Sequence, residues 1–409
     1  MENGTIRVGL IGAGANTRLR HIPGFREQKG VEIVAVANRS RESGEAIASE
    51  YEIPAVYDNW LELMEADDID AVCVGTWPYM HNTLVLAALE NDKHVLTEAR
   101  MAMDAQEAHE MLNASRQFPH LVTQIVPAPQ TLQVDQTVQD LIGSGELGQL
   151  LALRLRVCDY HGRVDRSDTF MNTDGHLHWR QNRLLSGYNI MGMGIWYEAL
   201  MRYVGPATKV MAMTRVFTNQ RKDEEGVMRG VTIPDHVNVL CEFASGVQAD
   251  LSWSTVTGMQ TGSELWIFGS EGTIKLEGPP FEKVWLGKPG DTDFKEHPIA
   301  DGKRGKWQVE QDFIDSIRSA RPVTHTPFDV GVQYMEFTEA VTRSAQSGHT
   351  IFLPLYVIFL KPNHSIINYQ GEQQWLQKES GSASLGLVKI PETGTSLDFR
   401  RWTDSRLRP

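Results

Sequence analysis

The chain has 409 residues, of which 41% are hydrophobic and 22% are charged. This length exceeds the need of one compact core, so we expect two domains and an appendage. Lys and Arg number 39 against 52 Asp and Glu, and the net charge of −13 disfavours nucleic acid or an anionic membrane as a partner. Without a long apolar run or a signal-like start, we expect neither a membrane span nor a secretory leader.

The three cysteines, Cys73, Cys158 and Cys241, lie far apart in the sequence. Their spacing matches neither a disulfide framework nor a zinc site. We therefore expect a cytoplasmic protein.

The first predicted element is a buried strand at residues 6–11, followed by a glycine-containing turn and the start of a helix. This is the layout of a dinucleotide-binding unit, in which the glycines allow a tight turn and close approach of a pyrophosphate. Thr17 stands where a third small residue is usual, so a plain structural turn is the alternative. The residues expected at the pyrophosphate are Gly12, Gly14, Ala15 and Asn16.

The second predicted strand, 31–37, ends at the position of the ribose-reading residue. A carboxylate there would favour NAD, but Asn38 has none, whereas Arg39, Ser40 and Arg41 supply cations and a hydroxyl. A 2′-phosphate favours that set, so we expect NADP(H), with NAD(H) as a possibility. Two arginines on a solvated loop are the alternative.

Strands and helices then alternate until the pattern changes near Leu150. The alternation predicts a parallel sheet, with strands at 70–76, 93–98 and 121–126 and helices at 81–90 and 131–142. A run of strands with hairpin turns predicts a second, α+β domain, with strands at 150–157, 237–243, 246–254, 263–268 and 272–276.

The order of several short motifs resembles the Gfo/Idh/MocA family of glucose–fructose oxidoreductases and inositol dehydrogenases. The matching pieces are Gly12-x-Gly14 with Arg20-His21-Ile22-Pro23, Gly75-Thr76-Trp77-Pro78, Lys93-His94-Val95-Leu96-Thr97-Glu98, Gly145-Glu146-Leu147-Gly148, Trp179-Arg180 before Ser186-Gly187, and Phe268-Gly269-Ser270-Glu271-Gly272. The resemblance implies a Rossmann domain and a second domain whose open, largely antiparallel sheet covers the nicotinamide and often mediates dimerisation. It also implies NAD(P)-dependent oxidation or reduction of a sugar, cyclitol or polyol.

With this resemblance, we expect a dinucleotide-binding Rossmann domain over 1–126 and an α+β substrate and oligomerisation domain over 127–355. Residues 356–409 form a C-terminal extension with no assigned role. The resemblance further implies that the loop after the fourth Rossmann strand contacts the nicotinamide, mostly through its backbone. The cofactor contacts expected there and at the next strand end are Thr76, Trp77, His81 and Glu98.

The chain departs from the family at the residues that do chemistry. The family carries Glu-Lys-Pro where this chain has Glu98-Ala99-Arg100, and Ala99 cannot move a proton. The family's Asp and His positions align with Gly192 and Trp196. Another proton relay is therefore required.

Two relays are candidates. Tyr197 adjoins the vacated His position, although its pKa of about 10 would need lowering, and a core tyrosine is the alternative. His176 and His178 would share one face of an extended chain, with Asp174 to orient them, and a solvated loop is the alternative. This cluster lacks a clear third ligand, so we expect no metal.

Planar donors and aromatic rings suit a hydroxyl-rich substrate. The expected substrate contacts are Arg100, Trp179, Arg180, Tyr188, Asn189 and Trp196. Core packing is the alternative for the tryptophans, and for Arg100 the alternatives are an anionic group or a pairing near Glu98.

The expected function is an NADP(H)-preferring oxidoreductase that transfers hydride between nicotinamide and a sugar, cyclitol or polyol-like alcohol or ketone. We expect a homodimer or homotetramer. Two other functions stay open: a cofactor-retaining lyase or hydrolase that transiently oxidises a glycoside, and a non-catalytic protein that senses a nicotinamide dinucleotide or another ligand.

Overall fold

The structure, a computed structural model, describes residues 4–158, 176–258, 262–278, 280–355, 358–360 and 366–368. Its first unit contains a six-stranded parallel sheet in the order β3-β2-β1-β4-β5-β6. The strands are β1 Ile6–Ile11, β2 Val31–Ala37, β3 Ala55–Tyr57, β4 Ala71–Val74, β5 His94–Thr97 and β6 Thr123–Ile125. This order is that of a Rossmann fold, in which the chain connections run in opposite directions from β1 and from β4 and leave a ligand crevice at the carboxyl ends of these two strands.

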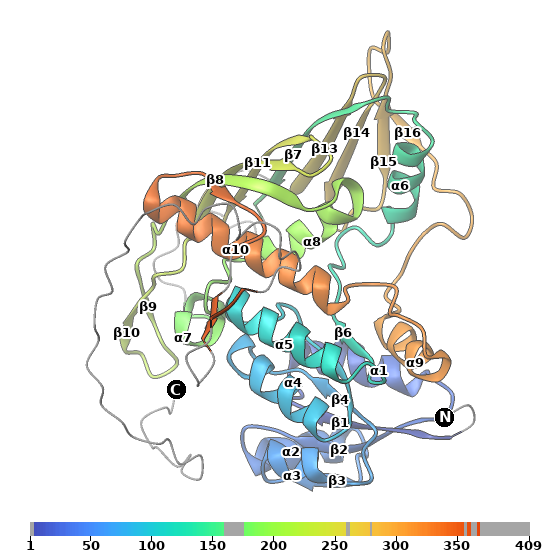
Figure 1. Ribbon diagram of the computed structural model, residues 1–409, viewed down its shortest axis with the longest axis vertical. Helices are drawn as coiled ribbons and strands as arrows, with labels where there is room; N and C mark the ends of the chain where they lie inside the picture. Colours follow the sequence, from blue (N-terminus) through green and yellow to red (C-terminus); the bar gives the residue numbers. More distant parts are fainter. Residues whose placement is uncertain are drawn as a thin grey trace.

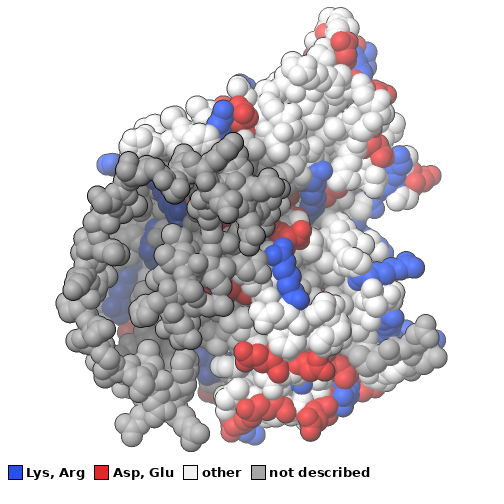
Figure 2. Space-filling view, in the orientation of Figure 1, with Lys and Arg blue, Asp and Glu red and all other residues white. Residues whose placement is uncertain are grey.

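Helices cover both faces of this sheet, which is why β4 and β5 are buried along their whole length. A π-helical turn, Thr17–His21, leads into α1 Ile22–Arg26, and the other helices are α2 Arg41–Glu50, α3 Trp60–Glu65, α4 His81–Glu90 and α5 Ala105–Gln117. Three of these helices have an N-cap residue directly before their first residue, namely Ser40, Asn59 and Asp104. The side chain of each N-cap accepts a hydrogen bond from the backbone N–H three residues later. Figure 2 shows acidic side chains gathered on the lower part of this face, over the first unit.

The second unit contains a nine-stranded sheet in the order β16-β15-β14-β13-β7-β12-β11-β8-β17. All its neighbours are antiparallel except the β7–β12 pair. The strands are β7 Leu150–Val157, β8 Ala207–Arg215, β11 His236–Phe243, β12 Gln248–Ser254, β13 Ser263–Gly269, β14 Thr273–Gly278, β15 Val284–Gly287, β16 Lys295–His297 and β17 Ile351–Phe352, and a separate hairpin holds β9 Gln220–Lys222 and β10 Met228–Gly230. The expected fold class, an α/β parallel sheet followed by a largely antiparallel sheet, is confirmed.

The described residues contain five further α-helices: α6 Asp135–Gly143, α7 Arg183–Ser186, α8 Met193–Val204, α9 Val309–Ser319 and α10 Phe328–Ser347. Helix α10 lies between the large sheet and α5, so it joins the two units (Figure 1). Helix α9 returns to the first unit and packs against α1. The predicted helix at 131–142 begins later, at Asp135, because Thr131 and its neighbours form a turn.

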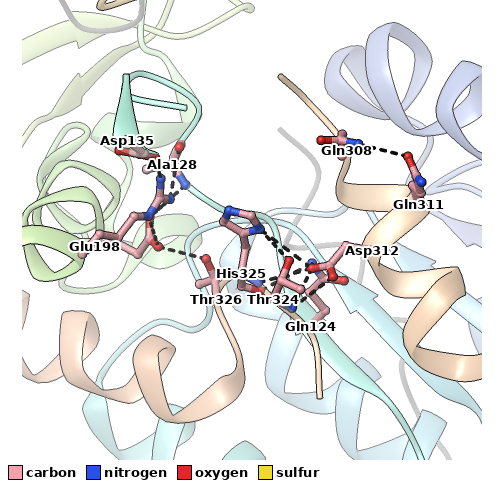
Figure 3. Close-up of polar contacts among 11 residues, drawn as sticks. Gln124, Ala128, Asp135, Glu198, Gln308, Gln311, Asp312, Thr324, His325 and Thr326 are labelled. Carbon is pink, nitrogen blue, oxygen red and sulfur yellow. Dashed lines mark hydrogen bonds and ion pairs between the residues drawn. The ribbon is translucent and has the colours of Figure 1, made fainter. Parts of the chain in front are cut away.

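A polar joint connects the units near the end of β6 (Figure 3). The amide of Gln124 donates to Asp312 of α9 over 3.0 Å, and Asp312 also accepts from the backbone N–H of Thr324. Two residues further on, Thr326 donates to Glu198 of α8 over 3.0 Å. The joint therefore holds α8 at a fixed position beside the Rossmann sheet.

Most of the predicted extension, and Asp174 with the rest of 159–175, lies outside the described residues. Within the extension, β18 Ile358–Leu360 pairs with β19 Ile366–Asn368. None of the helices in the described ranges is both long and apolar enough to cross a bilayer. The three cysteines are buried.

Candidate functional site

The loops after β1 and β4 meet at the crevice. Gly12 has φ +81°, and a Cβ there would lie 2.7 Å from Cγ2 of Thr76. A Cβ on Gly75 would lie 2.2 Å from Oγ1 of Thr17, so close packing of the two loops requires both glycines. A Cβ on Gly14 would come no nearer than 3.8 Å to another atom. Packing does not explain Gly14, but an open approach for a pyrophosphate does.

The residues around this turn fit a dinucleotide. Oγ1 of Thr76 is buried at the crevice without a hydrogen bond to the described residues. The first N–H groups of the helix after the turn, near Ala15 and Asn16, have no intrahelical acceptor. The Asn16 side chain donates to Glu98, which ties the turn to the end of β5. Free donors at a helix start favour a phosphate.

The polar residues at the end of β2 differ in whether they contact other protein groups. The Asn38 side chain accepts from the N–H of Ala13 over 2.8 Å, and Ser40 begins α2. Arg41 forms ion pairs with Glu45 and Asp58. Arg39 is exposed, and we find no hydrogen bond or ion pair between its guanidinium and the described residues.

A buried ionic cluster lies beneath the turn. Nδ1 of His21 lies 2.5 Å from Glu310 of α9, and its Nε2 lies 3.0 Å from Glu98. Burial opposes the charge on this imidazole, but the hydrogen bonds that its N–H groups donate to the two carboxylates, together with the negative charges of these groups, outweigh burial and raise the pKa of His21 to about 9. Trp307 also donates to Glu310, over 2.8 Å. Glu98 is therefore occupied by protein groups, and it holds the loop that follows β5.

That loop contains a cis peptide bond between Ala99 and Arg100. The side chain of His81 fills the space behind the loop, with Nδ1 2.9 Å from the carbonyl oxygen of Arg100 and Nε2 3.0 Å from that of Thr76. Burial lowers the pKa of His81. His81 therefore connects the loop after β4 with the loop after β5. Its side chain is not available to a ligand, which could contact only the backbone of these loops.

Four of the predicted residues come together across the crevice. Trp77 stacks on Trp179, with ring centroids 6.0 Å apart and an interplanar angle of 18°. The guanidinium of Arg180 lies 4.1 Å from the centroid of the Trp179 ring, and His178 contacts the same ring. Partial desolvation, Arg180 and Arg100 lower the pKa of His178 to about 4. His178 is therefore a neutral, accessible imidazole at pH 7.

Two predicted substrate contacts instead hold the 99–103 loop. The N–H of Tyr188 donates to the carbonyl of Met103 over 2.8 Å. The buried Asn189 amide donates to the carbonyls of Ala102 and Ser186. These residues position the loop. His176 is exposed, and its backbone bridges to Lys222 of β9.

Tyr197 and Trp196 lie in the hydrophobic core rather than at the crevice. Tyr197 stacks on Phe337 at a centroid distance of 3.7 Å, and its hydroxyl accepts from the N–H of Ala207 over 2.7 Å. Burial raises the pKa of Tyr197 further from neutrality. Trp196 packs against Phe281. The geometry supports the core-packing alternatives for both residues, and we keep neither in the proposals below.

This placement gives a testable result for Tyr197→Phe. The substitution leaves the buried N–H of Ala207 without its acceptor, so we expect the free energy of unfolding to fall by about 1–3 kcal/mol. Turnover per folded molecule should not change. Urea unfolding and turnover measured on the same preparations check both expectations, and a loss of turnover at unchanged stability would restore Tyr197 as the relay.

Sequence reasoning missed two residues of this region. His21 stood within a family motif without a role, and Glu310 lies 289 positions away in the chain. A histidine between Arg20 and Ile22-Pro23 gives only a weak local signal, and its two carboxylates become neighbours only through folding. Within the described residues, no group of three or more metal-binding side chains is found.

A Rossmann crevice offers backbone N–H groups to a phosphate at its glycine turn and lies beside the side chains of Trp77, Trp179 and Arg180. This combination defines the class of enzymes that depend on a nicotinamide dinucleotide. Residues 6–123 match the model "Oxidoreductase family, NAD-binding Rossmann fold", and residues 136–275 match the "GFO/IDH/MocA C-terminal domain". The chain therefore belongs to the Gfo/Idh/MocA family of NAD(P)-dependent oxidoreductases.

Relatives and solved structures agree with this assignment. The chain is 30% identical to 1,5-anhydro-D-fructose reductase of Ensifer adhaerens, over 66% of this chain and 74% of that protein. It is 28% identical to dTDP-3,4-didehydro-2,6-dideoxy-alpha-D-glucose 3-reductase of Saccharopolyspora spinosa, with the same coverage. Levoglucosan dehydrogenase in complex with NADH and L-sorbose has the same fold, with a TM-score of 0.72 at 19% identity over 85% of this chain and 99% of that one.

Proposed function

We propose that the chain is an NADP(H)-preferring oxidoreductase that transfers hydride between nicotinamide and a sugar, cyclitol or polyol-like alcohol or ketone. The substrate class is supported by the relatives, whose names describe reductases of an anhydro sugar and of a nucleotide-linked sugar. The stacked Trp77 and Trp179 supply an aromatic face of the kind that packs on the C–H groups of such rings.

The cofactor preference rests on the guanidinium of Arg39, which forms no hydrogen bond or ion pair with the described residues. It lies directly after β2, where the adenosine ribose of a dinucleotide is read in this fold. Arg41 is engaged by Glu45 and Asp58, and Asn38 by Ala13, so Arg39 is the cation that can reach a 2′-phosphate without breaking another contact.

The substitution Arg39→Ala tests this preference. Loss of a charge-assisted contact should weaken NADPH by about 10- to 100-fold and leave NADH within about twofold. Fluorescence titration with both dinucleotides measures the two affinities. Arg41→Ala is the matched control, with a small effect on either, and equal weakening of NADPH and NADH by Arg39→Ala would refute the preference.

For the proton transfer, His178 is our candidate. A bound nicotinamide would supply or accept the hydride, and the substrate hydroxyl needs a group that takes its proton during oxidation. The neutral imidazole of His178 would accept that proton at Nδ1, in place of the backbone N–H of Arg180, which donates to this atom over 3.3 Å in the ligand-free chain. Nδ1 lies beside the stacked rings of Trp77 and Trp179. The guanidinium of Arg180 lies over the ring of Trp179 and would bind substrate oxygens.

We further propose a cytoplasmic homodimer or homotetramer. The outer face of the large sheet exposes Met211, Met213 and Leu240, together with Arg154 and Asp250 of opposite charge. Such a face can pair with its own copy about a twofold axis. Three buried cysteines that lie far apart in the sequence suit a reducing compartment.

A further inference from the structure

Arg100 is a buried cation for which the described residues supply no counter-ion. Its side chain is 1% exposed, which places it among the largest fully buried side chains of the structure. Its Nε has no hydrogen-bond partner, and we find no ion pair between this guanidinium and the described residues. Buried charges are paired in nearly all proteins, because an unpaired one costs several kcal/mol.

Glu98, the carboxylate nearest to Arg100 in the sequence, does not pair with the Arg100 guanidinium. Glu98 is occupied by Asn16 and His21, on the side of the strand end that faces the glycine turn. The pairing with the neighbourhood of Glu98 that the sequence left open is therefore not made. The cost of burying Arg100 needs a compensating anion from elsewhere.

The Arg100 side chain packs against α8. Ala99 precedes it, Gly192 stands at the family's Asp position, and a Cβ on Gly194 of α8 would lie 3.4 Å from Cδ of Arg100. The guanidinium is also close enough to His178 to depress the pKa of that imidazole. The charge of Arg100 therefore acts on the candidate proton acceptor.

We propose that Arg100 binds an anionic oxygen group of the substrate, a carboxylate or a phosphate, beside the carbon that exchanges hydride. The substrate is then a sugar acid or sugar phosphate rather than a neutral polyol. This inference rests on the proposed function, since it specifies the substrate class of that same site. A guanidinium suits this task because its planar fork donates two parallel hydrogen bonds to one anionic group.

The same contact would adjust the proton acceptor. In the ligand-free chain the charge of Arg100 opposes protonation of His178. Desolvation and Arg180 lower the pKa of His178 more than Arg100 does, so an anion bound to Arg100 would offset one part of this effect and would favour transfer of the hydroxyl proton to His178. Binding of the anion and readiness for proton transfer would therefore be coupled.

Calorimetry on the full chain with saturating NADP+ tests the proposal, with three probes of one carbon skeleton: D-gluconate, D-glucose 6-phosphate and the neutral D-glucitol. We expect one anion to bind at least about tenfold more tightly than D-glucitol, and the better of the two identifies the source of the charge. Arg100→Met should abolish the preference and Arg100→Lys should keep part of it. Arg116→Gln, at an exposed arginine of α5, is the control that should keep all of it.

Thermal unfolding without ligand gives a second, independent readout. Arg100→Met removes an unpaired buried charge, so the melting temperature should rise, whereas loss of a structural cation would lower it. A lowered melting temperature, failure of both anions to bind at millimolar concentration, or an anion preference that survives in Arg100→Met would each overturn the proposal. Dinucleotide titration of the wild-type chain distinguishes failure of the proposed function from failure of the Arg100 proposal. If neither NADP(H) nor NAD(H) binds, the proposed function is refuted. If a dinucleotide binds but the chain prefers the neutral D-glucitol, only the role of Arg100 is refuted.

Discussion

Replacing Glu198 by Ala is expected to lower the free energy of unfolding by about 3–5 kcal/mol, because the change leaves buried groups without their shared acceptor. The carboxylate of Glu198 accepts from the N–H of Ala128 over 2.9 Å and from Thr326 over 3.0 Å. It also pairs with Arg202 at 2.5 Å. The substitution thus removes the centre of the joint between α8 and the Rossmann unit (Figure 3).

The control for this result is Glu277→Ala. Both glutamates pair with a cation, but the Glu277 side chain is 52% exposed against 4% for Glu198. An exposed pair contributes about 0–1 kcal/mol, so this control should change stability little. Urea unfolding of the two variants measures the difference. A loss below about 1 kcal/mol in Glu198→Ala would mean that water replaces the carboxylate and that the joint is not dry.

The Rossmann half could be predicted from the sequence because local signals specify it. An apolar run, a glycine turn and a regular alternation of strands predicted β1, β2 and β4 and placed α4 at its observed bounds. The short edge strand β3 and the returning helix α9 were not predicted. Their positions depend on contacts with distant segments, such as that of α9 with α1, which no local pattern encodes.

The candidate site could be predicted only in part. Its glycines and Arg39 follow from the position of each strand end, which is a local property. The roles of Tyr197 and Arg100 depend on the direction of a side chain on a helix or after a bend, and that direction is set by packing. Tyr197 turns toward Phe337 and Phe243, while Arg100 turns into the space beside Gly194.

Stability should depend on pH through the buried imidazole of His21. The pKa of His21 is about 9 in the folded chain and about 6.5 when unfolded, a difference equivalent to about 3 kcal/mol. Since the folded pKa is the higher one, this stabilisation is fully present below pH 6.5 and is lost as the pH rises through 9. Its partner Glu98 has a lowered pKa, so its contribution is present above about pH 4.5 and is lost on acidification.

The variant His21→Gln isolates this effect, because other titrating groups act equally on both proteins. The wild-type chain should lose about 3 kcal/mol of unfolding free energy relative to His21→Gln between pH 6 and pH 10, as measured by urea unfolding at each pH. His120→Gln, at an exposed pair with Asp92, should keep the wild-type slope. Parallel pH profiles for wild type and His21→Gln would show that the imidazole is neutral between its carboxylates, with the proton held by Glu98 or Glu310. In that case the loop carrying Arg100 would be held by neutral hydrogen bonds instead of an ion cluster.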